Sequence, residues 1–145
     1  MARAQKRAPA GLWYSNWRIW LAARKLLEEA LAPVHLHPKQ FWLLALIRES
    51  PKSQTELASL CGVDPSTLVA LLDELQACSW ITRIRHPMDR RVHLVALTEA
   101  GSAILGRAMP LARRAETRQL RALAGGERTR LLALLRKLVD AKLES

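Results

Sequence analysis

The stretch from residue 53 to residue 101 constrains the fold of this chain more than any other part. It opens with Ser53 and, three residues later, Glu56, a spacing that caps a helix start through reciprocal hydrogen bonds. Gly62 then ends a helix of fewer than two turns, because glycine readily adopts the positive φ of a helix C-cap. The pair Asp64-Pro65 suits the N-cap and the first position of a second helix. Two short helices joined by about four residues that include a glycine indicate a helix-turn-helix.

The second helix of this motif has an apolar face and a more polar face. Four leucines recur at positions i, i+3, i+4 and i+7 and are therefore expected to be buried together: Leu68, Leu71, Leu72 and Leu75. The opposite side carries two hydroxyls and two small apolar groups: Ser66, Thr67, Val69 and Ala70. Such groups suit base edges and thymine methyls in a DNA major groove. Asp73 and Glu74 would be repelled by phosphate, so only the first turn is expected to enter a groove. On this helix alone, a solvated face is an equally good interpretation.

A basic hairpin is predicted next. Residues 81–85 and 91–97 are typical of strands, and turn residues lie between them at 86–89. The hairpin sets four arginines against one acid: Arg83, Arg85, Arg90 and Arg91, with Asp89. The planar fork of arginine binds phosphate bidentately and also enters a narrow A·T-rich minor groove. An ordinary solvated hairpin more often mixes acids with bases, so this segment favours a nucleic-acid partner.

The whole chain is basic, with 23 Lys and Arg against 13 Asp and Glu and a formal net charge of +10. This balance favours an anionic partner without separating DNA, RNA and acidic membrane. Within the first eleven residues, Arg3, Lys6 and Arg7 predict a basic arm. A length of 145 residues predicts a single domain. No apolar run approaches the roughly 18 residues that span a bilayer, no signal peptide is visible, and two cysteines are too few for a disulfide framework. We therefore expect a cytoplasmic protein.

A long helix is predicted over residues 12–31, stopped by Pro33. It is apolar on two faces and so needs two partners, of which one can be its own domain and the other a second subunit. One face carries three of the five tryptophans of the chain, Trp13, Trp17 and Trp20. They can be dimer packing, or they can line a pocket in which Arg18 or Arg24 holds a carboxylate. Helical spacing favours packing.

The remaining helices are marked by their ends. Proline begins the segment 38–49, and Thr98 caps a helix predicted to reach about residue 123 and to be kinked by Pro110. Gly125 and Gly126 then break the chain before a last helix over residues 127–143. That helix repeats leucine on one face, which we assign to a dimer interface: Leu131, Leu134, Leu135 and Leu138.

Histidines and cysteines give weak signals. His35 and His37 lie in a loop with no further ligand nearby, which favours a loop without metal over a zinc site. Cys61 and Cys78 are interpreted as small packing residues and not as redox sensors. We expect neither a cofactor nor a metal.

The sequence resembles the multiple antibiotic resistance regulator (MarR) family of winged-helix transcription factors. The resemblance is carried by Asp89-Arg90-Arg91 followed by Leu97-Thr98-Glu99-Ala100-Gly101, by GVDPSTLVALLDEL at 62–75, and by HPKQFWLLALI at 37–47. Two positions depart from the family pattern. Ala70 stands where many members carry an arginine or another polar contact, and Ser79 where a glycine usually ends the recognition helix.

The resemblance implies a mainly α fold of about six helices with a small β-hairpin wing, all within one domain. Residues 38–101 would form the winged helix-turn-helix lobe, and residues 12–31 and 103–143 the dimerisation helices. It implies a homodimeric regulator, most often a repressor, that binds a pseudo-palindromic operator in double-stranded DNA. Aromatic acids often act as effectors in this family, and the residues that would line their site are Trp17, Trp20, Arg24, Phe41 and Trp42.

The expected DNA contacts follow from the motif and from the resemblance together. Four residues would enter the major groove: Ser66, Thr67, Val69 and Ala70. Arg90 would enter the minor groove, while Gln54, Arg83 and Arg85 would hold phosphates. Asp89 would pair with Arg91 and keep the wing in shape.

Three alternatives stay open. A sequence-tolerant architectural DNA-binding protein would share the charge and the winged helix, and a metal- or redox-sensing regulator would share the fold. An enzyme is the least favoured class, because the cysteines and histidines are scattered and no glycine-rich phosphate loop or metal motif is present.

Overall fold

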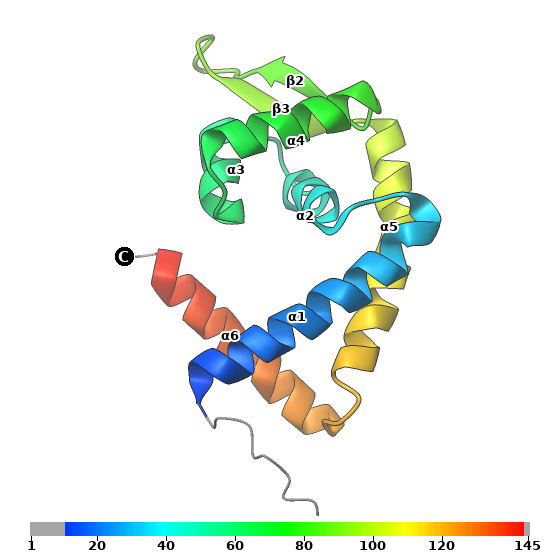
Figure 1. Cartoon of the computed structure of the whole chain (residues 1–145). Helices are drawn as coiled ribbons and strands as arrows, with labels where there is room; N and C mark the ends of the chain where they lie inside the picture. The colour runs from blue at the N-terminus through cyan, green and yellow to red at the C-terminus, as the bar shows by residue number, and fades with distance from the viewer. Residues whose placement is uncertain (1–10, 144–145) are drawn as a thin grey trace, which may run out of the picture.

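The computed structural model describes residues 11–143, which form six α-helices and one three-stranded sheet (Figure 1). The predicted basic arm with Arg3, Lys6 and Arg7 lies outside the described residues. The helices are α1 (Leu12–Leu31), α2 (Pro38–Ile47), α3 (Gln54–Cys61), α4 (Pro65–Ala77), α5 (Glu99–Gln119) and α6 (Gly125–Leu143). The strands are β1 (Lys52–Ser53), β2 (Ile81–Arg85) and β3 (His93–Leu97), and a 3₁₀ turn at Ala32–Val34 follows α1. The predicted mainly α winged helix-turn-helix fold is confirmed.

The molecule has two parts. Helices α2, α3 and α4 and the sheet gather in one lobe, and α5 runs from that lobe to the opposite end of the molecule, where α1 packs along it and α6 follows (Figure 1). Among residues 11–143, no helix combines the length and the apolar character that crossing a bilayer requires.

One hydrophobic core holds the lobe together. Its least exposed side chains come from α1, α2, α3, α4 and β3: Leu31, Leu43, Leu44, Leu57, Leu68, Leu72, Leu75 and Val95. Three of the four leucines predicted to be buried in α4 are buried, whereas Leu71 is only half-buried. Each fully buried leucine stabilises the fold by roughly 1.5–3 kcal/mol, so this core can sustain the lobe.

The helix starts of the lobe are capped as predicted. Ser53 Oγ accepts the Glu56 N–H at 3.2 Å, and the Glu56 carboxylate accepts the Ser53 N–H at 2.7 Å. The hydrogen bonds that the Glu56 carboxylate accepts from the Ser53 N–H and from the Ser53 hydroxyl hold the pKa of Glu56 below its usual value. Gly62 ends α3 with φ +62°, and the Asp64 side chain caps α4.

The start of α5 fastens the turn between α4 and β2. Thr98 Oγ1 donates to the Ser79 carbonyl at 2.7 Å and accepts the Gly101 N–H at 3.0 Å. A Cβ on Gly101 would lie 1.9 Å from the Trp80 carbonyl oxygen, so only glycine fits there. Ser79 has φ +59°, in the left-handed region that favours glycine. Ser79, which stands where glycine is usual, therefore adopts the backbone conformation of the turn at some cost in strain.

The sheet differs from the predicted two-stranded hairpin. Lys52 and Ser53 add a third strand, antiparallel to β3 and opposite Val95 and Leu94, and the strand order is β1-β3-β2. Two residues were too short a signal to predict. β3 begins at His93 and not at residue 91, because a turn at Asp89 occupies the preceding residues.

Three helix ends also differ. α2 ends at Ile47 instead of residue 49, and α5 runs unbroken through Pro110 but ends at Gln119 instead of about residue 123. The chain turns over Leu120–Ala124, and the Glu127 carboxylate accepts the Ala124 N–H at 2.8 Å. α6 therefore begins at Gly125, and the two glycines form its first turn instead of a break.

Candidate nucleic-acid interface

The first turn of α4 is organised by Asp64. Its carboxylate accepts hydrogen bonds from Ser66 Oγ at 2.5 Å, from Thr67 Oγ1 at 2.5 Å and from the Thr67 N–H at 2.9 Å. These bonds, led by the one from Ser66, hold the pKa of Asp64 far below its usual range. The two hydroxyls predicted to meet bases are therefore fixed by an ionised neighbour. Val69 and Ala70 are exposed on the same helix.

Arg83 has a different partner from the predicted phosphate. Its Nη2 donates to Asp73 Oδ1 at 2.7 Å, and its Nη1 donates to Gln76 Oε1. Because β2 packs beside α4, the guanidinium reaches two side chains on that helix. Arg83 thus joins the wing to α4 and compensates the charge of Asp73.

The second acid of α4 is also engaged. Glu74 Oε2 accepts a hydrogen bond from Gln40 Nε2 of α2 at 3.0 Å. Both carboxylates expected to repel phosphate are thus tied to the scaffold.

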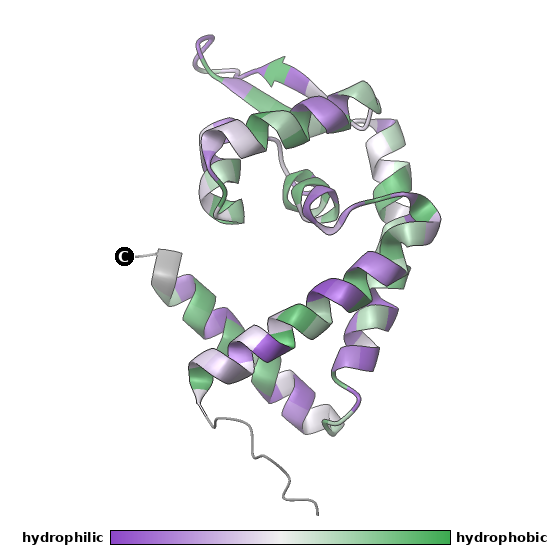
Figure 2. Ribbon diagram, in the orientation of Figure 1, coloured by the Kyte–Doolittle hydropathy of each residue, from purple (hydrophilic) through white to green (hydrophobic). Residues whose placement is uncertain are grey.

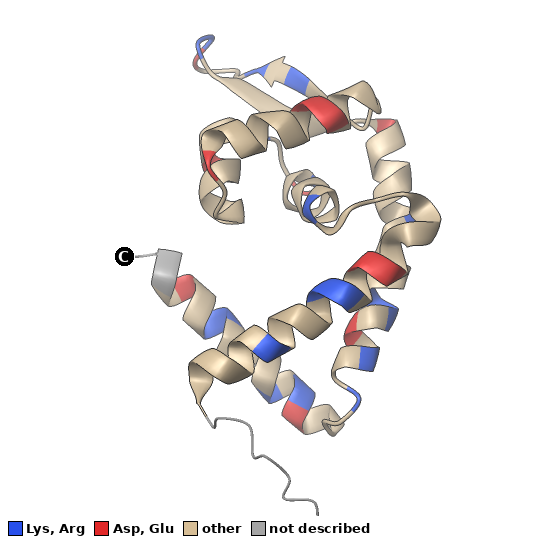
Figure 3. Cartoon of the chain, in the orientation of Figure 1, with Lys and Arg blue, Asp and Glu red and all other residues tan. Residues whose placement is uncertain are grey.

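The wing tip presents the remaining arginines. Arg85, Arg90 and Arg91 are exposed and belong to none of the ion pairs found among residues 11–143. Figure 3 shows the basic residues of the wing beyond α4. Gln54, which was also predicted to contact phosphate, is the first residue of α3 and is half-buried.

Asp89 shapes the wing tip through the backbone. Its carboxylate accepts the Arg91 N–H at 3.0 Å and makes no ion pair with the Arg91 guanidinium, which was the predicted partner. Sequence reasoning missed His86, whose Nδ1 accepts the N–H groups of Met88 and Asp89 at 3.1 and 3.2 Å. A histidine before Pro87 carries no periodic signal, so nothing in the pattern pointed to it.

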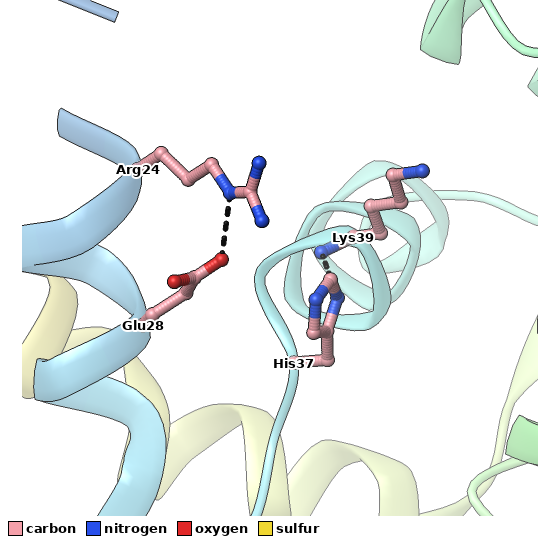
Figure 4. Close-up of polar contacts among 4 residues, drawn as sticks. All are labelled: Arg24, Glu28, His37 and Lys39. Atoms are coloured by element: carbon pink, nitrogen blue, oxygen red, sulfur yellow. Dashed lines mark hydrogen bonds and ion pairs between the residues drawn. The ribbon is translucent and has the colours of Figure 1, made fainter. Parts of the chain in front are cut away.

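The predicted effector residues are only partly brought together. Arg24 of α1 pairs with Glu28 at 2.8 Å (Figure 4), and its guanidinium lies 5.8 Å from the centre of the Trp20 ring. Trp17 and Trp42 are about half exposed. Phe41, by contrast, is 2% exposed and belongs to the core, because α2 turns it inward beside Leu44.

A cavity of about 320 Å³ lies elsewhere, between α2, α3 and α4. It includes Trp42 but none of the other predicted effector residues, and its lining is Lys39, Trp42, Leu43, Leu46, Leu60, Cys61, Val63 and Leu71.

The histidines and cysteines have structural positions. His37 caps α2, its Nδ1 accepting the Lys39 N–H at 3.2 Å (Figure 4). Among residues 11–143, no three metal-ligating side chains are grouped together. Cys61 is half-buried, and burial raises the pKa of its thiol, which fits a packing residue. Cys78 ends α4 and is exposed, so its interpretation as a packing residue is wrong.

The long helices outside the lobe expose large apolar side chains, which we call the apolar bands of α1 and α6. The residues concerned are Leu12, Trp13, Trp17, Ile19 and Trp20 of α1, and Leu132, Leu134, Leu135, Leu138 and Val139 of α6. Figure 2 shows that apolar and polar residues alternate along both helices. Exposed apolar area of this extent on α1 and on α6 marks an interaction surface.

Comparison with known proteins agrees with this geometry. The sequence model of the MarR family matches residues 36–92. The HTH-type transcriptional repressor NicR of Pseudomonas putida is 37% identical over 103 residues, which cover 70% of this chain and 65% of that protein. The chain spans about half to two thirds of the length of the curated relatives it matches.

Two solved structures extend the similarity to most of the fold. The transcriptional repressor CouR, bound to a 23-mer DNA duplex, is 37% identical with a TM-score of 0.80, over 89% of this chain and 92% of that one. A Mycobacterium tuberculosis MarR family protein in complex with salicylic acid is 28% identical with a TM-score of 0.75, over 90% of this chain and 97% of that one.

Proposed function

The chain belongs to the MarR family, and we propose that it is a homodimeric, sequence-specific transcriptional regulator that acts as a ligand-responsive repressor in the cytoplasm. The observation that carries the proposal is the presence, on one lobe, of exposed residues in the first turn of α4 and of exposed arginines at the wing tip, with Arg83 and Asp73 joining the wing to α4. A helix turn of this size suits a major groove, and arginines beside it suit the flanking minor groove.

Each subunit would place Ser66, Thr67, Val69 and Ala70 against base edges and Arg90 in the minor groove. Arg85 and Gln54 would hold phosphates, which position the protein without specifying sequence. Arg91 would add positive charge to the wing tip, whose shape Asp89 maintains. The ion pair of Arg83 with Asp73 supports the removal of Arg83 from the phosphate contacts.

The apolar bands on α1 and α6 support dimerisation through these helices. A two-fold dimer predicts an operator whose half-sites lie about ten base pairs apart, or a multiple of that. The relatives matched are regulators, and we propose that this chain has no catalytic activity of its own.

The effector would be a small aromatic or anionic molecule held between α1 and α2. Trp17, Trp20 and Arg24 on α1 would meet Trp42 on α2, and Figure 4 shows the Arg24 side chain on the side of α1 that looks towards α2. A ligand that favours a spacing of the two lobes unsuited to DNA would lower operator occupancy in proportion to its preference. Salicylate tests this assignment. It is expected to release the operator from wild type and from Arg18→Gln but not from Arg24→Gln.

The function is tested by selecting bound fragments from the genomic DNA of the source organism at about 150 mM salt, where non-specific affinity is weak. Wild type and Arg90→Ala are run side by side. Enrichment of one pseudo-palindromic site, weakened by the substitution, establishes a specific regulator. Binding without any enriched site overturns the proposal in favour of a sequence-tolerant architectural protein.

A further inference from the structure

The hydroxyl protons of Ser66 and Thr67, at the start of α4, are already used in hydrogen bonds to Asp64. Ser66 Oγ and Thr67 Oγ1 each lie 2.5 Å from a different carboxylate oxygen of Asp64. A hydroxyl has one proton to donate, and an ionised carboxylate can only accept. The pKa of Asp64 lies far below its usual range, so both hydroxyls are the donors in these bonds. What remains available on each hydroxyl is an oxygen lone pair.

This commitment restricts what the hydroxyls can read. Serine and threonine ordinarily bond either donors or acceptors on base edges. Two oxygens limited to accepting require partners that donate, and in the major groove these are adenine N6 and cytosine N4. Turning a hydroxyl towards guanine O6 or thymine O4 would break a charge-assisted bond, which is roughly twice as strong as a neutral one.

The charge of Asp64 acts in the same direction. Asp64 is exposed at the N-terminal end of α4, and its carboxylate accepts three hydrogen bonds from Ser66 and Thr67 of that helix. A negative charge there attracts amino groups and repels the major-groove acceptors, which are guanine O6, thymine O4 and the purine N7 atoms. The two effects combine at one helix turn.

We propose that the first turn of α4 reads exocyclic amino groups, with Ser66 and Thr67 as acceptors and Asp64 as the positioning residue that sets their polarity. This inference rests on the proposed function, because it presumes that this turn faces bases. It assigns to Asp64 a role in base preference beyond its role as a helix cap.

The test uses the enriched operator and base analogues. Ser66→Ala and Thr67→Val identify the base pairs that the hydroxyls contact, as the positions where the variants lose discrimination. At those positions adenine is replaced by purine, which lacks the N6 amino group, or by 7-deaza-adenine, which lacks the N7 acceptor. Cytosine is replaced by its 4-deamino analogue.

Removing the amino group is expected to weaken wild-type binding about tenfold, whereas removing N7 changes it by less than about twofold. Asp64→Asn keeps an N-cap, since asparagine caps helices as well as aspartate. Its amide also donates a hydrogen bond, so a hydroxyl is released from donating. This variant is expected to lose the sensitivity to the amino group and to accept guanine or thymine at the contacted position.

Two results would overturn the inference: loss of affinity on removing N7 and not the amino group, or an Asp64→Asn variant with unchanged base preference. Circular dichroism shows whether the Asp64→Asn variant is folded. Ser66→Ala gives a second, independent measurement of whether the Ser66 hydroxyl accepts a hydrogen bond from the base. An absence of any enriched operator sinks the proposed function instead. If an operator is enriched but its affinity does not change when the amino groups are removed, only this inference is wrong.

Discussion

The lobe and the long helices outside it differ in how much of their apolar surface one chain can bury. Leu72 and Leu75 in the lobe have no exposed surface, whereas Trp13 on α1 and Leu138 on α6 are 83% and 63% exposed. The lobe is complete within a single chain. The apolar bands on α1 and α6 stay exposed in a single chain, and we propose that a second copy of the chain covers them.

The two regions also differ in how their helices begin. In the lobe, α2, α3 and α4 each have a side chain that accepts a hydrogen bond from their first turn. α1 begins after Gly11, which provides no such cap. Local sequence therefore shapes the lobe, while α1 depends on packing for its stability. The surfaces proposed for DNA binding and for dimerisation therefore lie in different regions, which α5 connects.

The largest expected effect comes from placing charge on the α6 band. Leu134→Asp combined with Leu138→Asp should abolish the dimer and lower operator affinity more than about a hundredfold, because one lobe loses the contribution of the other. Sedimentation equilibrium and operator titration measure both quantities. Ala133→Asp, on the opposite side of α6, is the matched control, and equal losses in both variants would contradict the assignment of this face.

A second pair of variants separates folding of the lobe from assembly. Leu72→Ala should cost about 2–5 kcal/mol of unfolding free energy, by an amount independent of protein concentration. Leu138→Ala should lower the melting temperature by an amount that depends on concentration, because it removes contacts between subunits. Thermal unfolding at two protein concentrations decides. A concentration-independent loss in Leu138→Ala would mean that α6 packs within its own chain.

Within the lobe, two arginines should respond differently to salt. Arg90→Ala should lower the slope of log affinity against log salt by about 0.9. The reason is that one positive charge, which displaces a counterion when Arg90 enters the minor groove, is lost. Arg83→Ala should weaken binding while leaving the slope unchanged, because its guanidinium is held by Asp73 and Gln76. Operator titrations at several salt concentrations distinguish the two variants. A lowered slope in Arg83→Ala would show that Arg83 does contact phosphate.

The smallest expected effect is a dependence of lobe stability on acid. The folded-state pKa of Asp64 is lowered, so its contribution is present above the ordinary aspartate pKa of about 3.9 and is lost as the pH falls through the folded value. The stability advantage of wild type over Asp64→Asn should therefore be constant above about pH 5 and shrink as the pH falls from about 5 to about 2. Calorimetry on both proteins measures it, and an advantage that grows in acid would contradict the cap.

Much of the lobe could be predicted because its signals are local. Ser53 with Glu56, Gly62, and Asp64 with Pro65 each fix one helix end through a bond or a dihedral angle within a few residues. Ile81–Arg85 was predicted with its observed bounds for the same reason.

What could not be predicted depends on contacts between distant segments. Strand β1 exists only because Lys52 and Ser53 meet β3 about forty residues later, and Arg83 changes partner only because β2 lies beside α4. Phe41 and Trp42 are adjacent, yet one is core and the other is exposed. The hydroxyls of Ser66 and Thr67 were identified, but their shared attachment to Asp64 required coordinates.

The most direct test of the central claim changes the spacing between the two half-sites of the enriched operator. If the α1 and α6 helices fix two complete lobes at one separation, inserting about five base pairs turns one half-site to the far side of the duplex. Affinity is then expected to fall at least about a hundredfold. Inserting about ten base pairs puts both half-sites on one side of the duplex again but at a larger distance, so it is expected to recover little of the affinity. Affinity unchanged by the five-base-pair insertion would contradict the claim, because it would show lobes that bind DNA independently of each other.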